Sequence, residues 1–114
     1  MKKLKKKIHK YQDIEKDAEG YLKNNQNWNI LIAQEIAQNE NINLNSDHWK
    51  IIYFVRDFYF KFNMTPSMRM LINAIQKKIK NKKINSIYLF TLFPKGPAKQ
   101  ASKIAGIPKP AQCL

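Results

Sequence analysis

Apolar residues recur at intervals of three and four along most of this chain, which predicts amphipathic helices. A first helix is expected over residues 27–39, with a stripe formed by Trp28, Leu31, Ile32, Ile36 and Ala37. A second is expected to open at Pro66, because proline is favoured at the first helical position, with Thr65 as its cap. The apolar stripe of this helix consists of Met68, Leu71, Ile72, Ile75 and Ile79.

The segment from Asp47 to about Asn63 is the most hydrophobic part of the chain and is expected to form the central, buried helix. Ser46 is its expected N-cap, with Asp47 in the first turn. Arg56 and Asp57 lie within it as partly buried ions that need partners elsewhere in the fold. The apolar residues cover most of the circumference and are Trp49, Ile52, Tyr53, Phe54, Val55, Phe58, Tyr59 and Phe62.

Near the N-terminus, alternating polar and apolar residues in Lys5–Lys10 and Asp13–Lys16 predict a short β-hairpin. A turn is expected at Asp17–Gly20, because glycine supplies the backbone freedom that a tight turn needs. Residues 1–7 form a basic extension with no assigned role. The expected fold class is therefore α+β but mainly α.

Two short helices are expected after a basic loop at Lys77–Lys83. Ser86 is expected to cap a helix over Ile87–Leu92. A last helix is predicted over residues 97–105, because it can begin with a proline and ends before Gly106.

The C-terminal residues 107–114 are expected to form an extended, mobile tail. Pro108 and Pro110 exclude a helix there. The single cysteine of the chain, Cys113, lies in this tail as the second residue from its end. A proline-rich end cannot enclose a thiol in a core, so Cys113 is expected to be exposed and suited to delivery into the pocket of another protein.

Length and composition limit the remaining possibilities. The 114 residues, 44% of them hydrophobic, predict one domain, 1–114, with a packed core. No apolar run follows the basic start, so neither a signal peptide nor a membrane span is expected, and the protein is placed in the cytoplasm. His9 and His48 have no further ligand at metal-binding spacing, no glycine-rich phosphate loop occurs, and no cofactor is expected. His48 is expected to cap or pack a helix.

Charge is distributed unevenly along the chain. Residues 1–57 hold ten basic and all eight acidic side chains, whereas residues 58–114 hold eleven basic and no acidic ones. Codon bias in an A/T-rich genome raises the lysine content but does not exclude Asp and Glu, whose codons are also A/T-rich. The second half is therefore expected to face an anionic partner, either RNA or an acidic protein surface. A solvated lysine-rich face with no partner is an equal alternative.

The sequence LFPKGPAKQASKIAGIPKPAQCL at residues 92–114 closely resembles the C-terminal signature of the DsrC/TusE family of sulfur-relay proteins. The resemblance continues upstream in EGYL (19–22), HW (48–49), FVRDFY (54–59) and RML (69–71), and covers nearly the whole chain from about Ile14. It implies a small orthogonal helical bundle with an N-terminal hairpin and a flexible C-terminal tail.

The resemblance also implies that Cys113 is the catalytic residue and accepts sulfane sulfur as a persulfide. Members that work with dissimilatory sulfite reductase carry a second cysteine at the position of Ser102, eleven residues before Cys113. Serine cannot form a disulfide, so the chain resembles the TusE branch. That branch implies a sulfurtransferase without cofactor that takes sulfur from a TusBCD complex. The carrier then passes it to the tRNA thiouridylase MnmA for 2-thiolation of wobble uridine.

Two other functions stay open on the residues alone. One is a winged-helix-like nucleic-acid-binding module with an inert thiol, which the acid-free half would suit. With Arg56 and Arg69 as the only arginines, however, it has no arginine-rich recognition surface. The other is a scaffold protein. Replacing Cys113 by serine separates them, since only sulfur transfer needs the thiol.

Overall fold

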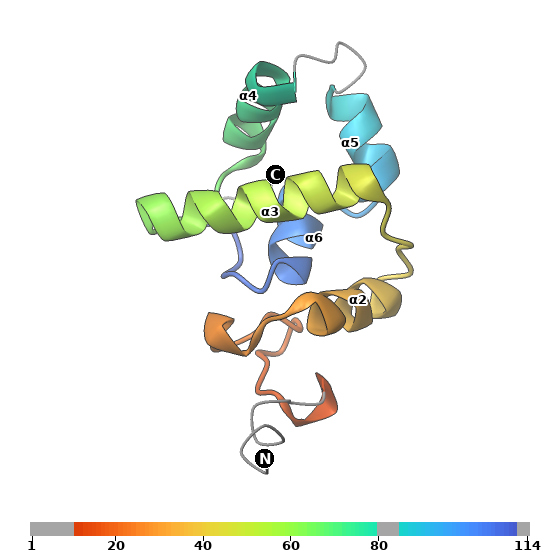
Figure 1. Cartoon of the computed structure of the whole chain (residues 1–114), viewed down its shortest axis with the longest axis vertical. Helices are drawn as coiled ribbons and strands as arrows, with labels where there is room; N and C mark the ends of the chain where they lie inside the picture. The colour runs from red at the N-terminus through yellow and green to blue at the C-terminus, as the bar shows by residue number, and fades with distance from the viewer. Residues whose placement is uncertain (1–10, 80–84, 112–114) are drawn as a thin grey trace, which may run out of the picture.

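The computed structural model describes residues 11–79 and 85–111, apart from the side chains of Lys78 and Ile79. These ranges contain five α-helices and two short 3-10 helices (Figure 1). The 3-10 helices are η1 (Tyr11–Asp13) and η2 (Asn25–Asn27). The α-helices are α2 (Ile30–Asn39), α3 (Ser46–Phe62), α4 (Met68–Ile79), α5 (Ser86–Leu92) and α6 (Pro97–Ile104). The predicted mainly helical fold is therefore confirmed.

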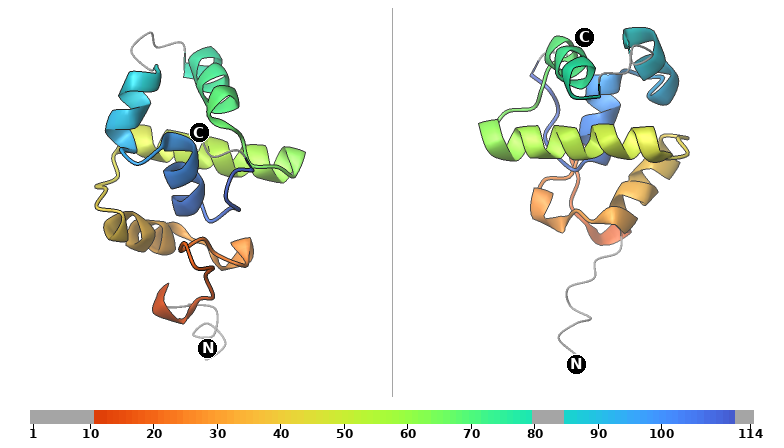
Figure 2. Two further views of the ribbon diagram at one scale, coloured as in Figure 1. Left: turned by 180° about the vertical axis from the view of Figure 1, so that it is seen from behind. Right: turned by 45° about the horizontal axis from the view of Figure 1, so that its top comes forward.

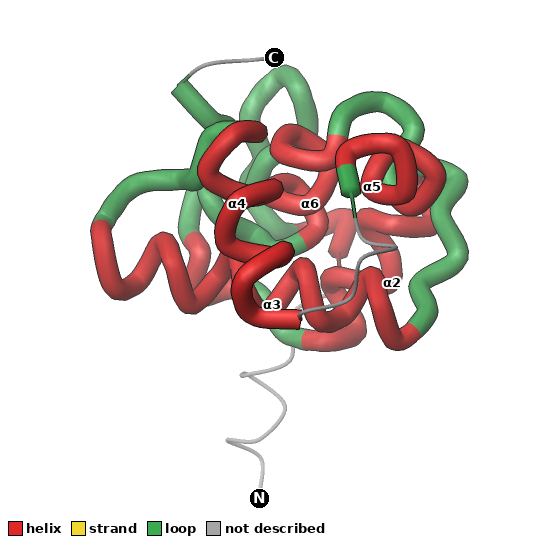
Figure 3. The backbone as a smooth tube through the Cα atoms, turned by 90° about the horizontal axis from the view of Figure 1, so that it is seen from above, coloured by secondary structure: helices red, strands yellow, loops and turns green. Residues whose placement is uncertain are grey.

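The other helices are arranged around α6, which packs against α2, α3, α4 and α5. In Figure 1, α3 crosses the molecule from side to side, α2 lies below it, and α4 and α5 lie above it. The view from behind in Figure 2 shows α6 between these layers, and Figure 3 shows the same grouping from above.

The expectation that residues 47–63 form the central helix is wrong, because α6 holds that position. Six of the eight residues of α6 are buried. Ala98, Ala101 and Ser102 are small, so neighbouring helices can approach this helix closely. By contrast, only one face of α3 is buried, and two of the aromatic residues of this helix, Phe60 and Phe62, are each 55% exposed. The buried residues of α3 are His48, Ile51, Ile52 and Val55.

Asparagine side chains cap the starts of three of the α-helices. Asn29, Asn45 and Asn85 each accept a hydrogen bond from a backbone N–H group in the first turn of α2, α3 and α5. The expected caps Ser46 and Ser86 are instead the first residues of α3 and α5. Because Asn29 is the cap of α2, this helix begins at Ile30, three residues later than predicted.

Helix α4 begins at Met68, two residues after the predicted start at Pro66. The Ser67 hydroxyl accepts a hydrogen bond from a backbone N–H group of the first turn at 3.3 Å, which is the role expected of Thr65. The Thr65 hydroxyl instead donates to the carbonyl of Pro108 at 2.8 Å. Thr65 thus connects the start of this helix to the C-terminal tail.

The N-terminal hairpin is not confirmed. Lys5–Lys10 lies outside the described residues, and Asp13, the first residue of the second predicted strand, belongs to η1. Lys16 forms an isolated antiparallel bridge with Leu22 instead. The turn between these two residues is confirmed, with Gly20 at a φ of +94°.

Two further expectations concern α4 and the membrane. Helix α4 continues through Ile79, so the start of the predicted loop Lys77–Lys83 is helical, while residues 80–83 lie outside the described ranges. Among the described helices, none has the length and apolar character needed to span a bilayer.

Candidate functional site

Cys113, the predicted reactive residue, lies outside the described residues. The structure does describe the chain that leads to it, from the end of α6 to residue 111. This segment is called the tail root here and comprises residues 105–111. The geometry of the tail root fixes the point on the fold from which the last residues of the chain, including Cys113, continue.

The tail root begins with a tight turn at Gly106, which confirms the predicted end of the last helix. Ala105 is the C-cap of α6, and Gly106 follows at a φ of +72°, a conformation that favours glycine. A Cβ atom on Gly106 would lie 2.5 Å from Cδ1 of Trp28. The turn therefore requires glycine both for its backbone angle and for the close approach of Trp28.

Two side chains from other elements hold the carbonyl groups at the end of α6. The indole N–H of Trp28 donates to the carbonyl of Ile104 at 2.7 Å, and Nη1 of Arg56 donates to that of Ala105 at 2.7 Å. The last carbonyls of a helix have no partner within it, and a cation is favourable at this end. Trp28 and Arg56 therefore fix the point at which the tail leaves α6.

The Arg56 guanidinium is enclosed by aromatic rings. It lies 4.0 Å from the centroid of Trp28 and 4.9 Å from that of Phe60. Burial lowers the pKa of Arg56, and the nearby charge of Asp57 opposes this shift. The sequence analysis expected partners for the Arg56 cation without naming them. In the structure they are a backbone carbonyl and two aromatic faces.

The mobility expected from Ile107 onward is not confirmed for the tail root. The side chain of Ile107 is fully buried in the core, and Pro110 is buried as well. Pro108 accepts the hydrogen bond from Thr65, and Lys109 forms an ion pair with Glu19 at 2.9 Å. The predicted absence of a helix is confirmed, because residues 107–111 are non-helical. An apolar residue after the turn is enough to anchor a chain that has no regular structure.

Ser102, where the family resemblance leads us to expect a second cysteine in other members, is fully buried in α6. Its hydroxyl donates to the carbonyl of Ala98 at 2.6 Å. A side chain here faces the core, so a group from the tail can reach it only if the packing opens.

His48 is a packing and capping residue, as predicted. Its Nδ1 accepts a hydrogen bond from the N–H of Asn45, and its Nε2 lies 2.8 Å from the carbonyl oxygen of Leu92. This pattern requires a neutral imidazole that donates through Nε2. His9 lies outside the described residues, and within the described part of the chain no three His, Cys, Asp or Glu side chains form a metal-binding group.

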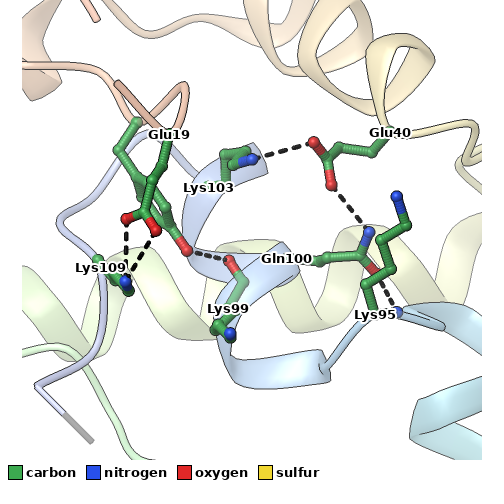
Figure 4. A pocket seen from close by; sticks show the side chains of 8 residues that line it. Glu19, Glu40, Lys95, Lys99, Gln100, Lys103 and Lys109 are labelled. Atoms are coloured by element: carbon green, nitrogen blue, oxygen red, sulfur yellow. Dashed lines mark hydrogen bonds and ion pairs between the residues drawn. The ribbon is translucent and has the colours of Figure 1, made fainter. Parts of the chain in front are cut away.

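A charged pocket lies beside the tail root, with a volume of about 150 Å³ (Figure 4). Within it, Glu40 accepts hydrogen bonds from Nε2 of Gln100 at 2.9 Å and from Nζ of Lys103 at 3.0 Å. The charged residues that line the pocket are Glu19, Glu40, Lys95, Lys99, Lys103 and Lys109. We call it the lysine pocket.

The Glu40 carboxylate is held in its charged form. Burial raises the pKa of Glu40, but the hydrogen bonds from Gln100 and Lys103, together with the charges of Lys103 and Lys95, outweigh burial and lower it. The sequence analysis missed the lysine pocket. A signal was present, because Lys95, Lys99 and Lys103 are four residues apart, and the last two share one face of α6.

Comparison with known proteins places this geometry in context. The sequence model of the family described as "DsrC like protein" matches residues 8–114. The chain is 70% identical over 107 residues to a protein named Sulfurtransferase TusE from Buchnera aphidicola subsp. Acyrthosiphon pisum, with 94% of each chain covered. It is 52% identical over 107 residues to the Sulfurtransferase TusE of Escherichia coli, with 94% of this chain and 98% of the relative covered.

Solved structures share the fold. The NMR structure of Allochromatium vinosum DsrC superposes with a TM-score of 0.81 at 44% identity, covering 89% of this chain and 90% of the other. The crystal structure of the oxidized gamma-subunit of the dissimilatory sulfite reductase (DsrC) from Archaeoglobus fulgidus gives a TM-score of 0.78 at 36% identity, covering 89% and 92%. These similarities do not favour the winged-helix alternative. The chain belongs to the DsrC-like family.

Proposed function

We propose that this chain is a sulfur carrier that holds sulfane sulfur as a persulfide on Cys113. The observation that carries the proposal is the family match, which extends through the last residues of the chain and so includes Cys113. Relatives that are 52–70% identical over most of the chain are named sulfurtransferases, which supports a sulfur-transfer role.

The transfer consists of two exchanges without net oxidation or reduction. The Cys113 thiolate attacks the outer sulfur of a donor persulfide, a new S–S bond forms, and the donor S–S bond breaks with its electron pair on the donor cysteine. An acceptor thiolate then attacks the outer sulfur of the Cys113 persulfide. The S–S bond to Cys113 breaks, and the Cys113 sulfur leaves as a thiolate. Each step exchanges one S–S bond for another, so the carrier needs no cofactor.

The tail root suits this task. Helix α6 is fixed among the other helices, and Trp28 and Arg56 hold its last carbonyls. Thr65 contacts Pro108, Lys109 pairs with Glu19, and Pro110 is buried, so the described chain is held close to its last residues. Cys113 follows Lys109 by four residues, and can enter the pocket of a partner protein without disturbing the core.

We assign the chain to the single-cysteine form of this chemistry. Ser102 occupies the position of the second cysteine and cannot receive sulfur from Cys113. The carried sulfur therefore stays in an open persulfide and not in an internal trisulfide.

For the cellular role, we propose a cytoplasmic relay for 2-thiolation of wobble uridine in tRNA. Sulfur would arrive from a TusBCD-like complex and leave to an MnmA-like tRNA thiouridylase. The support is the name shared by the relatives, together with the absence of a second cysteine.

Intact mass spectrometry after incubation with a persulfide donor tests the carrier function. The wild-type chain should gain the mass of one sulfur atom, which dithiothreitol removes, and Cys113→Ser should gain none. Added sulfur that survives dithiothreitol, or that Cys113→Ser gains as well, would contradict the proposal, because a persulfide on the single cysteine is reducible and needs its thiol.

A further inference from the structure

The lysine pocket has no part in the exchange at Cys113, yet its charges are not balanced. Four lysines and two glutamates leave two net positive charges. Lys103 and Lys109 are paired with the two glutamates, at 3.0 Å and 2.9 Å. The ammonium groups of Lys95 and Lys99 form no hydrogen bond or ion pair with another described residue. The pocket therefore presents two available cations to a negatively charged group.

The size of the pocket limits what that group can be. About 150 Å³ is smaller than the roughly 300–1,000 Å³ of most small-molecule sites, so a nucleotide or cofactor does not fit. Figure 4 shows the carboxylates of Glu19 and Glu40 among the lysines, where they would repel a polyanionic RNA backbone. A single carboxylate on a protein side chain is small enough for the pocket, and it carries far less negative charge toward Glu19 and Glu40 than an RNA backbone does.

We propose that the lysine pocket receives an acidic side chain of the protein with which Cys113 exchanges sulfur; this inference rests on the proposed function. Lys109 lines the pocket and precedes Cys113 by four residues, which span at most about 14 Å. A partner with its carboxylate in the pocket therefore has a surface within reach of the cysteine.

Docking at this position also acts on the tail. The Lys109–Glu19 ion pair is partly exposed, and such pairs are weak. An incoming carboxylate competes with Glu19 for Lys109. The partner thus loosens the Lys109–Glu19 ion pair, which is one of the polar contacts of the tail root, and gives the tail more freedom for transfer.

The test compares two double variants of the full chain with the same change in net charge. Lys95→Glu with Lys99→Glu alters the pocket, and Lys50→Glu with Lys61→Glu alters exposed positions on α3. Affinity for a TusBCD-like complex and for an MnmA-like enzyme is measured by calorimetry at low ionic strength, with tRNA as a third probe. Lys50, Lys61 and Lys95 are exposed and Lys99 is half-buried, so thermal melting checks that both variants fold.

We expect the pocket variant to bind at least one of the two proteins about tenfold more weakly, with a much smaller effect of the α3 variant. Equal losses from both variants would reduce the effect to net charge and overturn the proposal. So would a loss confined to tRNA, or unchanged binding of both proteins. Cys113→Ser should bind normally, which separates docking from chemistry. If Cys113 takes up no sulfur while the pocket variant still binds weakly, the carrier function fails and the docking site stands.

Discussion

At the level of single residues, the close approach of Gly106 to Trp28 is a tight constraint on the tail root. The positive φ of Gly106 directs the chain away from α6, and the indole ring occupies the space where a side chain would begin. The same indole donates to the last turn of the helix. Gly106 thus allows the chain to turn after α6 while Trp28 stays hydrogen-bonded to the last turn of that helix.

Replacing Gly106 by alanine should therefore destabilise the protein by about 2–4 kcal/mol, from backbone strain and from overpacking against Trp28. Urea unfolding measures the loss. Gly20→Ala is the matched control, because Gly20 also has a positive φ but the nearest atom to its added Cβ is 3.6 Å away. A cost for Gly106→Ala no larger than that of the control would show that the Trp28 contact is not the constraint.

Ser102 shows how burial changes the chemistry open to one position. A cysteine there would occupy the fully buried site in α6 and lose a hydrogen bond to Ala98 that contributes about 1 kcal/mol. Its sulfur would meet Cys113 only when the packing around α6 opens.

We expect oxidised Ser102→Cys to form a monomeric disulfide with two fewer hydrogens, more slowly than a thiol reagent modifies Cys113. Mild urea should speed the reaction, because it populates the opened form. Intact mass over time, with and without urea, measures both rates. Only intermolecular dimers after oxidation would contradict the prediction.

At the level of helices, Glu40 joins two elements that the sequence places far apart. It follows the last residue of α2, and its carboxylate accepts hydrogen bonds from two side chains of α6. The lowered pKa of Glu40 means that folding favours its charged form. Stability from this group is fully present above its ordinary pKa of 4.5 and is lost as pH falls through the lower pKa of the folded state.

Glu40→Gln should therefore cost about 1 kcal/mol at neutral pH, and this cost should shrink as pH falls below 4.5 and the wild-type carboxylate takes up a proton. Urea unfolding at several pH values measures the difference. Glu35→Gln on the exposed face of α2 is the control and should change stability little at any pH. A constant gap between wild type and Glu40→Gln across this range would argue against the charged network.

Helix boundaries were predictable where one residue type has a single role. Proline at the start of α6 and Gly106 after its end marked that helix to within one residue. The starts of α3 and α5 were one residue off, because asparagine and serine are consecutive there and both can cap a helix. Thr65 was misassigned because its hydroxyl bonds to a residue 43 positions away, a contact that local sequence does not contain.

The choice of central helix could not be made from hydrophobicity. Helix α6 is rich in small and polar residues, and it is enclosed because those residues allow four helices to pack on it. The candidate cysteine could be found in the sequence from its position in a proline-rich tail. The lysine pocket could be found only in part, because the spacing of its lysines is visible in the sequence, whereas Glu19 and Glu40 come from two distant stretches of the chain.

At the scale of the whole molecule, charge is separated along the fold. All acidic residues precede residue 58, so α4, α5, α6 and the tail root contain only cations among their charged side chains. Residues 58–114 carry eleven of them. Such a surface attracts a negatively charged partner over distances set by the Debye length, about 30 Å at 0.01 M salt and about 8 Å at 0.15 M.

Association of the carrier with an acidic partner protein should therefore slow by about tenfold or more between these two salt concentrations, while dissociation changes less. Stopped-flow mixing with the sulfur donor complex at a series of salt concentrations measures the association rate. The salt dependence should be smaller for Lys95→Glu with Lys99→Glu, because this variant removes two cations and adds two acids beside the tail. An association rate that is independent of salt would point to an apolar interface instead, and the exposed rings of Phe60 and Phe62 on α3 would then be the surface to mutate.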